Sequence, residues 1–258
     1  MSSNAGASGA GGEPRLSSGV AAAGVGQVGA YLFTGIVILA SFYDPDTKSK
    51  VRAGLWPVVA QFPLLWFGLL LTIYAAARVR KESIRTLTGF SVRPKDAFYA
   101  LIGVALQYGG GFAYSLFGQS EEVRKPADEL VNNARNNTFG FFVLALAVGV
   151  GAPLVEELFY RGLVARALER RFDHVFGSAN TRTTLVLSVM LSALWFGAIH
   201  GQPLQFPVLF LVGAVCAVLV LRVRRLGPAI FVHVGFNLTT VIALGLDLRS
   251  STGAIWRF

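Results

Sequence analysis

The chain has 258 residues, of which 53% are hydrophobic and 14% charged, whereas a soluble domain has roughly 25% charged residues. This composition excludes a soluble domain and predicts an all-α, polytopic transmembrane helical bundle with about seven spans of ~20 residues, or eight. The net charge of +9 is interpreted through the positive-inside rule, so the expected partner is the lipid bilayer and not nucleic acid.

The chain begins with a tail rich in Ser, Gly and Ala, residues 1–19, which we expect to be disordered. Residues 20–42 are apolar for longer than the hydrophobic region of a signal peptide, which predicts a retained first span. A G-x-G-x-x-G pattern at residues 24–29 lies inside this span without a preceding strand. We interpret the pattern as helix packing through small residues and not as dinucleotide binding.

Further apolar segments predict the remaining spans: residues 55–77, 97–117, 139–160, 184–200, 204–221 and 227–246. The polar residues 119–137 are expected to form a solvated loop. These segments divide the chain into N-terminal spans (20–137), a C-terminal core (138–246) and a C-terminal tail (247–258). The lone Cys216 excludes an intrachain disulfide and is expected to be a small core residue.

Lysine and arginine are distributed unequally over the predicted loops. The second, fourth and sixth connections carry six, five and three of them, whereas the first, third and fifth carry three, three and none. The positive-inside rule therefore predicts a plasma (inner) membrane protein with a cytoplasmic N-terminus, and it places residues 78–96 in the cytoplasm.

Two adjacent carboxylates, Glu156 and Glu157, lie near the end of the fourth predicted span, after Pro153, where a kink or restart is expected. Of fourteen acidic residues, only these two lie in a segment apolar enough to span a bilayer, which marks a candidate functional site. Arg161 shares a helix face with Glu157 and can neutralise it, whereas Glu156 points about 100° away. A purely structural ion-pair cluster at a helix end is the alternative interpretation.

More polar residues occur in later spans. His200 ends the fifth predicted span, and His233 and Asn237 share one helix face in the seventh. A single intramembrane histidine is commonly a hydrogen-bonded packing residue. Two histidines, an asparagine and an unpaired glutamate on three spans are each costly to bury without partners, so we expect one shared cavity.

Together these residues resemble the CPBP intramembrane proteases, which include type II CAAX prenyl endopeptidases and bacteriocin-processing proteins. The matching residues are Glu156, Glu157 and Arg161 (E-E-x-x-x-R), Phe196 and His200 (F-x-x-x-H), and His233 and Asn237 (H-x-x-x-N). The resemblance covers residues 139–240. It departs in detail at Tyr160, where the family usually has Phe.

The resemblance implies a membrane-embedded, glutamic-type endopeptidase that hydrolyses a peptide bond of a membrane-associated substrate without a cofactor. It implies that Glu156 is the general base, assisted by His200. His233 and Asn237 would stabilise the oxyanion. The implied supporting residues are Glu157, Arg161, Phe196 and Tyr160.

Three alternatives remain at this point. A non-catalytic immunity or scaffold protein of the same family would be free to lose its polar motif residues, and a proton-coupled transporter would need a polar path that the first three spans lack. Zinc held by Glu156, His200 and His233 is the rival mechanism, although no H-E-x-x-H helix is present.

His200 also lies on the side opposite Glu156 in this topology. Either its span is short and tilted, or the break at residues 201–203 lies at membrane depth.

Overall fold

The computed structural model describes residues 14–43, 55–119, 121–123, 125, 137–177 and 180–249, and every regular element within these ranges is a helix. The predicted all-α fold is confirmed. The elements are α1 (Pro14–Phe42), α2 (Leu55–Arg80), α3 (Ile84–Thr88), η1 (Pro94–Tyr99), α4 (Ala100–Leu116), α6 (Thr138–Leu146), η2 (Ala147–Gly151), α7 (Ala152–Glu156), η3 (Glu157–Ala165), α8 (Arg166–Phe176), α9 (Thr181–Ile199), α10 (Phe206–Val223) and α11 (Gly227–Arg249).

Six helices in the described part of the chain are long and apolar enough to cross a bilayer, compared with about seven predicted. The protein is therefore an integral membrane protein. The expected third span corresponds to α4, an apolar helix of 17 residues that is about 26 Å long. Helix α1 begins at Pro14, within the expected tail. Residues 1–13 and 250–258 of the two expected tails, and most of the expected polar loop, lie outside the described residues.

The segment that carries the two glutamates is one continuous helical element, Thr138–Phe176, of 39 residues. The expectation that this span ends near residue 160 is wrong, because the helix continues into the amphipathic α8, which buries Ala167 and Leu168. The helix also continues through Pro153, where a kink or restart was expected. The turn before this proline is widened into the π-helical η2, a form in which a residue without an N–H is accommodated. Glu156 consequently lies near the middle of the element.

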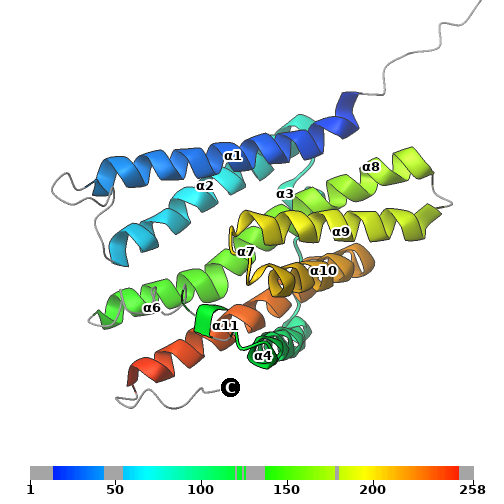
Figure 1. Ribbon diagram of the computed structural model, residues 1–258. Helices are drawn as coiled ribbons and strands as arrows, with labels where there is room; N and C mark the ends of the chain where they lie inside the picture. The colour runs from blue at the N-terminus through cyan, green and yellow to red at the C-terminus, as the bar shows by residue number, and fades with distance from the viewer. Residues whose placement is uncertain are drawn as a thin grey trace, which may run out of the picture.

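This long helical element runs through the middle of the bundle (Figure 1). On one side of it, α1 and α2 pack along each other and contact η3, with α1 also touching α8 and α2 touching α7. On the other sides it contacts α9, α10 and α11, and α4 packs against α11. Helices from both halves of the chain therefore surround the segment that carries the glutamates.

Small residues let the surrounding helices approach closely. A Cβ at Gly103 in α4 would lie 1.9 Å from the carbonyl oxygen of Val232 in α11. A Cβ at Gly26, within the G-x-G-x-x-G pattern of α1, would lie 2.1 Å from Oγ1 of Thr72 in α2. Contacts this close exclude any residue with a side chain, so this part of the pattern serves helix packing, as predicted.

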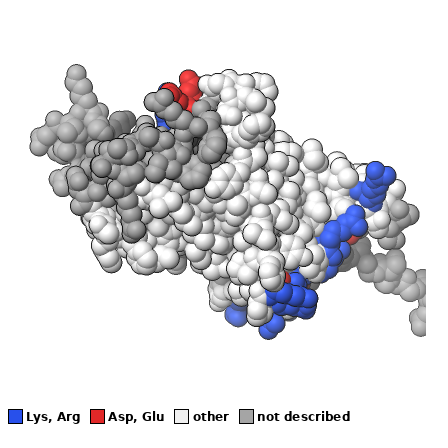
Figure 2. All heavy atoms as spheres, turned by 90° about the horizontal axis from the view of Figure 1, so that it is seen from below, with Lys and Arg blue, Asp and Glu red and all other residues white. Residues whose placement is uncertain are grey.

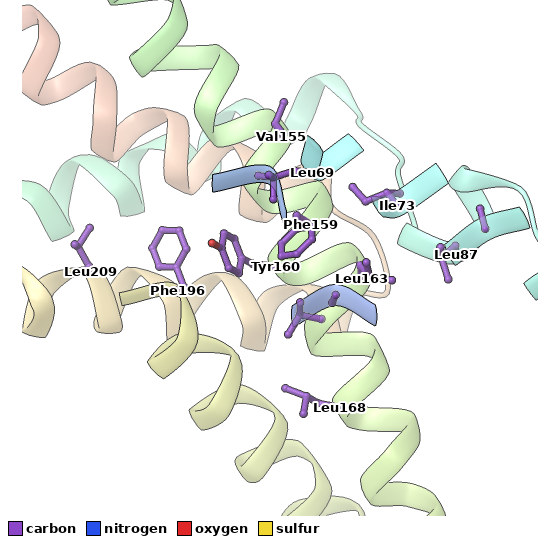
Figure 3. Packing of buried hydrophobic residues seen from close by; sticks show 14 residues of the cluster. Leu69, Ile73, Leu87, Val155, Phe159, Tyr160, Leu163, Leu168, Phe196 and Leu209 are labelled. Atoms are coloured by element: carbon purple, nitrogen blue, oxygen red, sulfur yellow. The ribbon is translucent and has the colours of Figure 1, made fainter. Parts of the chain in front are cut away.

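Buried apolar side chains from α2, α3, α9 and α10 pack against those of η3 in the long helical element (Figure 3). Tyr160 lies between Phe159 and Phe196, with ring centroids 5.1 and 5.3 Å away in edge-to-face orientation. Cys216 in α10 is also buried, with its Sγ 3.6 Å from the carbonyl oxygen of Ala229. This agrees with its expected role as a small core residue.

Lysine and arginine side chains gather at one end of the bundle, whereas most of the remaining face in Figure 2 is uncharged. Helix α2 ends with Arg78 and Arg80, and α10 with Arg222. Nearby, Arg225 pairs with the buried Asp96 of η1. The hydrogen bond from Arg225 lowers the pKa of the Asp96 carboxyl, so this pair is an ionised contact between η1 and the turn before α11.

Candidate active site

The two glutamates leave the long helical element in different directions. Glu156 closes α7 and Glu157 opens η3. The side chain of Glu157 is fully buried, whereas 19% of the Glu156 side chain is exposed. Glu156 is therefore the carboxylate that water or a substrate can reach.

Glu157 is paired inside the bundle. Nη1 of Arg161 lies 2.9 Å from Oε1 of Glu157, and neither side chain has any exposure. This is the pairing that the spacing of four residues predicts. The guanidinium also lies over the ring of Phe196, with Cζ 4.2 Å from the ring centroid, which is a cation–π contact. Arg161 thus balances the charge of Glu157 in a place that water does not reach.

His233 of α11 lies between the two glutamates. Its Nδ1 is 2.9 Å from Oε1 of Glu157, and its Nε2 is 3.9 Å from Oε2 of Glu156. The hydrogen bond from Nδ1–H to Glu157 orients the ring and selects the tautomer. The opposite ring nitrogen then faces the accessible carboxylate, so the imidazole lies between Glu157 and Glu156.

Asn237 of α11 binds the backbone of the widened turn, since its Nδ2 donates to the carbonyl oxygen of Val148 at 2.8 Å. This carbonyl lacks a helical donor because the N–H of Ala152 is bonded to Ala147 and residue 153 is proline. Asn237 therefore supplies the hydrogen bond that Pro153 cannot. One N–H of its amide remains for another partner.

His200 caps the end of α9, and its Nδ1 lies 2.7 Å from the carbonyl oxygen of Phe196. The ring of Phe196 is in edge-to-face contact with both His200 and His233, at centroid distances of 4.7 and 5.5 Å. The end of α9 therefore lies beside His233 and the glutamates that His233 contacts. Within the described residues, His200 makes no hydrogen bond to Glu156.

The comparisons with known proteins agree with this geometry. Residues 138–239 match the family model described as type II CAAX prenyl endopeptidase, Rce1-like. This segment is a domain of that family. No curated protein and no solved structure matches the chain. The Rce1-like domain includes every site residue singled out from the sequence, whereas α1, α2 and α4 lie outside it.

One residue outside the Rce1-like domain contacts the site and was missed by the sequence analysis. Gln27 of α1 is 2% exposed; its Nε2 donates to the hydroxyl of Tyr160, and its Oε1 accepts a hydrogen bond from Nε1 of Trp195 at 2.6 Å. A lone amide in an apolar span is a signal that could have indicated it. Tyr160 thus uses its hydroxyl to bind α1.

Metal binding by the Rce1-like domain was the rival mechanism. Among the residues that the structure describes, no group of three or more His, Cys, Asp and Glu side chains could hold a metal ion. In particular, His233 uses Nδ1 for Glu157, and His200 uses Nδ1 for a backbone carbonyl. Each imidazole has one ring nitrogen left.

Proposed function

We propose that the protein is an intramembrane endopeptidase that hydrolyses a peptide bond of a membrane-associated protein or peptide. The observation that carries the proposal is the pair of glutamates joined by His233. Glu157 is buried and neutralised by Arg161, whereas Glu156 is accessible and lies 3.9 Å from Nε2 of His233. The protease family of the C-terminal domain supports the same conclusion.

Glu156 is the general base of the proposed reaction. Its carboxylate takes a proton from a water molecule while the water oxygen attacks the carbonyl carbon of the scissile bond. The tetrahedral intermediate then collapses, the carbon–nitrogen bond breaks, and protonated Glu156 returns the proton to the leaving amine. One water is consumed for each peptide bond, and no cofactor takes part.

The histidines and the asparagine have separate tasks in this proposal. His200 assists Glu156 through Nε2, because Nδ1 is held by the carbonyl of Phe196. Asn237 stabilises the oxyanion with the N–H that Val148 does not use. His233 can donate from Nε2 only when its ring carries a second proton, because the Nδ1 hydrogen is given to Glu157.

The test is cleavage of membrane peptides by purified protein in proteoliposomes, followed by mass spectrometry. Each peptide is supplied with and without a prenyl group, because the family description names prenyl substrates. We expect the wild type to cleave and Glu156→Gln to be inert. Glu122→Gln is the matched control, because Glu122 is an exposed glutamate in the segment between α4 and α6.

Two outcomes contradict the proposal. Cleavage by Glu156→Gln at the wild-type rate would show that another group activates the water. Peptides left intact by the wild type would exclude proteolysis. Proton-coupled uptake by the same proteoliposomes would then favour a transporter, and its absence a non-catalytic member of the family.

A further inference from the structure

Helix α1 runs antiparallel to the long helical element that carries the glutamates (Figure 1). Near the start of α1, the Cβ position of Gly19 lies 3.6 Å from Cβ of Ala167. Further along, Gln27 binds Tyr160. The step from Gly19 to Gln27 on α1 is eight residues, and the matching step from Ala167 back to Tyr160 on the opposing helix is seven. These two contacts give the register in which the helices face each other.

One turn beyond Gln27, this register places Tyr31 opposite Glu156. Tyr31 follows Gln27 by four residues, and Glu156 precedes Tyr160 by four, so each pair lies along one helix face. The electrostatic interaction between Tyr31 and Glu156 agrees with this placement. Tyr31 is 40% exposed, so the surrounding helices do not enclose it completely.

The chemistry of the phenol decides what the Tyr31 hydroxyl can do. Gln27, one turn earlier on α1, accepts from Trp195 through Oε1 and donates to the Tyr160 hydroxyl through Nε2. A phenol hydroxyl is a donor as well as an acceptor. Tyr31 can therefore donate its O–H on the Glu156 side of the site.

The proposed reaction has few donors for the developing oxyanion. Asn237 has given one N–H to Val148, and a neutral His233 presents only a lone pair at Nε2. We propose that the hydroxyl of Tyr31 donates a hydrogen bond to the substrate carbonyl oxygen as this oxygen becomes the oxyanion. The proton stays on Tyr31, so the proton balance of the hydrolysis is unchanged. This inference rests on the proposed function, and it extends the site to a helix outside the Rce1-like domain.

The first test is kinetic and uses two phenylalanine variants. Tyr31→Phe keeps the ring and removes the hydroxyl. Tyr74→Phe is the matched control on α2, because its half-exposed ring lies under Arg78. Loss of one preorganised donor lowers kcat by about 10²–10³. We expect Tyr31→Phe to lose about 10² in kcat with an unchanged KM and unchanged thermal stability, and Tyr74→Phe to match the wild type.

A Tyr31→Phe protein with the wild-type kcat overturns this inference and leaves the proposed function standing. A loss that appears equally as a lower thermal stability, or as a raised KM alone, also overturns it. Either result would mean that Tyr31 holds the helices together or binds the substrate, and does not stabilise the oxyanion.

The second test needs no proteolysis. In a Cys216→Ala background, Tyr31→Cys and Glu156→Cys are combined and treated with a short bifunctional thiol reagent. The control pair is Val25→Cys with Glu156→Cys, because Val25 is 75% exposed and lies six residues earlier on α1, on another face of the helix. We expect cross-linking of the first pair only. Failure of the first pair to cross-link refutes the register. A wild type that cleaves no membrane peptide removes the donor role together with the proposed function, even where the first pair cross-links.

Discussion

Replacing Asn237 with Ala should destabilise the protein, and the size of this effect should depend on Pro153 in another helix. The change leaves the carbonyl of Val148 without the donor that it has in the structure. An unpaired buried polar group costs about 1–3 kcal/mol, and the bilayer interior offers no water to replace the lost donor. We therefore expect Asn237→Ala to lower the free energy of unfolding by about 1–3 kcal/mol.

The same change should cost much less when residue 153 has an N–H. In a Pro153→Ala protein, that N–H can donate to the Val148 carbonyl in the π-helical register, five residues away. There we expect Asn237→Ala to cost less than about 1 kcal/mol, so that the two sites are coupled by about 1–2 kcal/mol.

The coupling can be measured by reversible unfolding in mixed micelles, followed by tryptophan fluorescence. The four proteins are the wild type, Asn237→Ala, Pro153→Ala and the double variant. Thr239→Ala is the matched control on α11, because its hydroxyl donates to the carbonyl of Gly235 in its own helix at 2.8 Å. Its effect should be small and equal in both backgrounds. Equal destabilisation by Asn237→Ala with and without Pro153 would refute the reasoning.

The remaining predictions concern the buried pairs, orientation and metal. Glu157→Gln should lower the free energy of unfolding by up to roughly 3–5 kcal/mol, because it leaves a buried arginine unpaired, yet retain some activity per folded molecule; stable but inactive protein would contradict this. In a cysteine-free background, impermeant thiol reagents should label Gln119→Cys in intact cells and Lys95→Cys only after permeabilisation; the reverse pattern would invert the topology. The pKa of Asp96 is lowered by its pair with Arg225, so this pair stabilises the fold fully above about pH 4. The stabilisation is lost as the pH falls through the pKa that Asp96 has in the folded protein. Asp96→Asn should show no such loss in acid unfolding, and an identical pH profile would exclude the pair as its source. Finally, 1,10-phenanthroline should leave proteolysis unchanged; inhibition that added zinc reverses would establish a metal mechanism.

The spacing of residues within one helix was the reliable part of the sequence analysis. The pairing of Glu157 with Arg161 follows from positions four apart, and so does the shared face of His233 and Asn237. Their partners across helices do not follow from spacing, because a spacing carries no information on tertiary contacts. The hydrogen bond from His233 to Glu157 and the one from Asn237 to Val148 are of this kind.

The end of the fourth span was misplaced because charge was equated with a loop. Arg161 is fully buried, where it meets Glu157 and the ring of Phe196. In α8 the arginines occupy one side of an amphipathic helix whose other side buries Ala167 and Leu168. Because the fourth helix is longer than predicted, α9 begins farther from the glutamates. It runs back along α8, and its end at His200 then lies near them. The contribution of α1 was missed because Gln27 belongs to no family motif, and its being the lone amide of an apolar span was not used.

The register between α1 and the long helical element also has a consequence for the substrate. The apolar part of α1, Gly19–Ser41, has 23 residues, and Tyr31 lies next to its midpoint. The carboxylate of Glu156 is then near the bilayer midplane, about 15 Å from either surface of a ~30 Å hydrocarbon core. An extended chain covers ~3.3 Å per residue, so a bond cleaved there lies about four to five residues below the headgroups. The proposed proteolysis at this depth would select sequences whose membrane helix unwinds easily over one turn, such as those with glycine or proline near the cut.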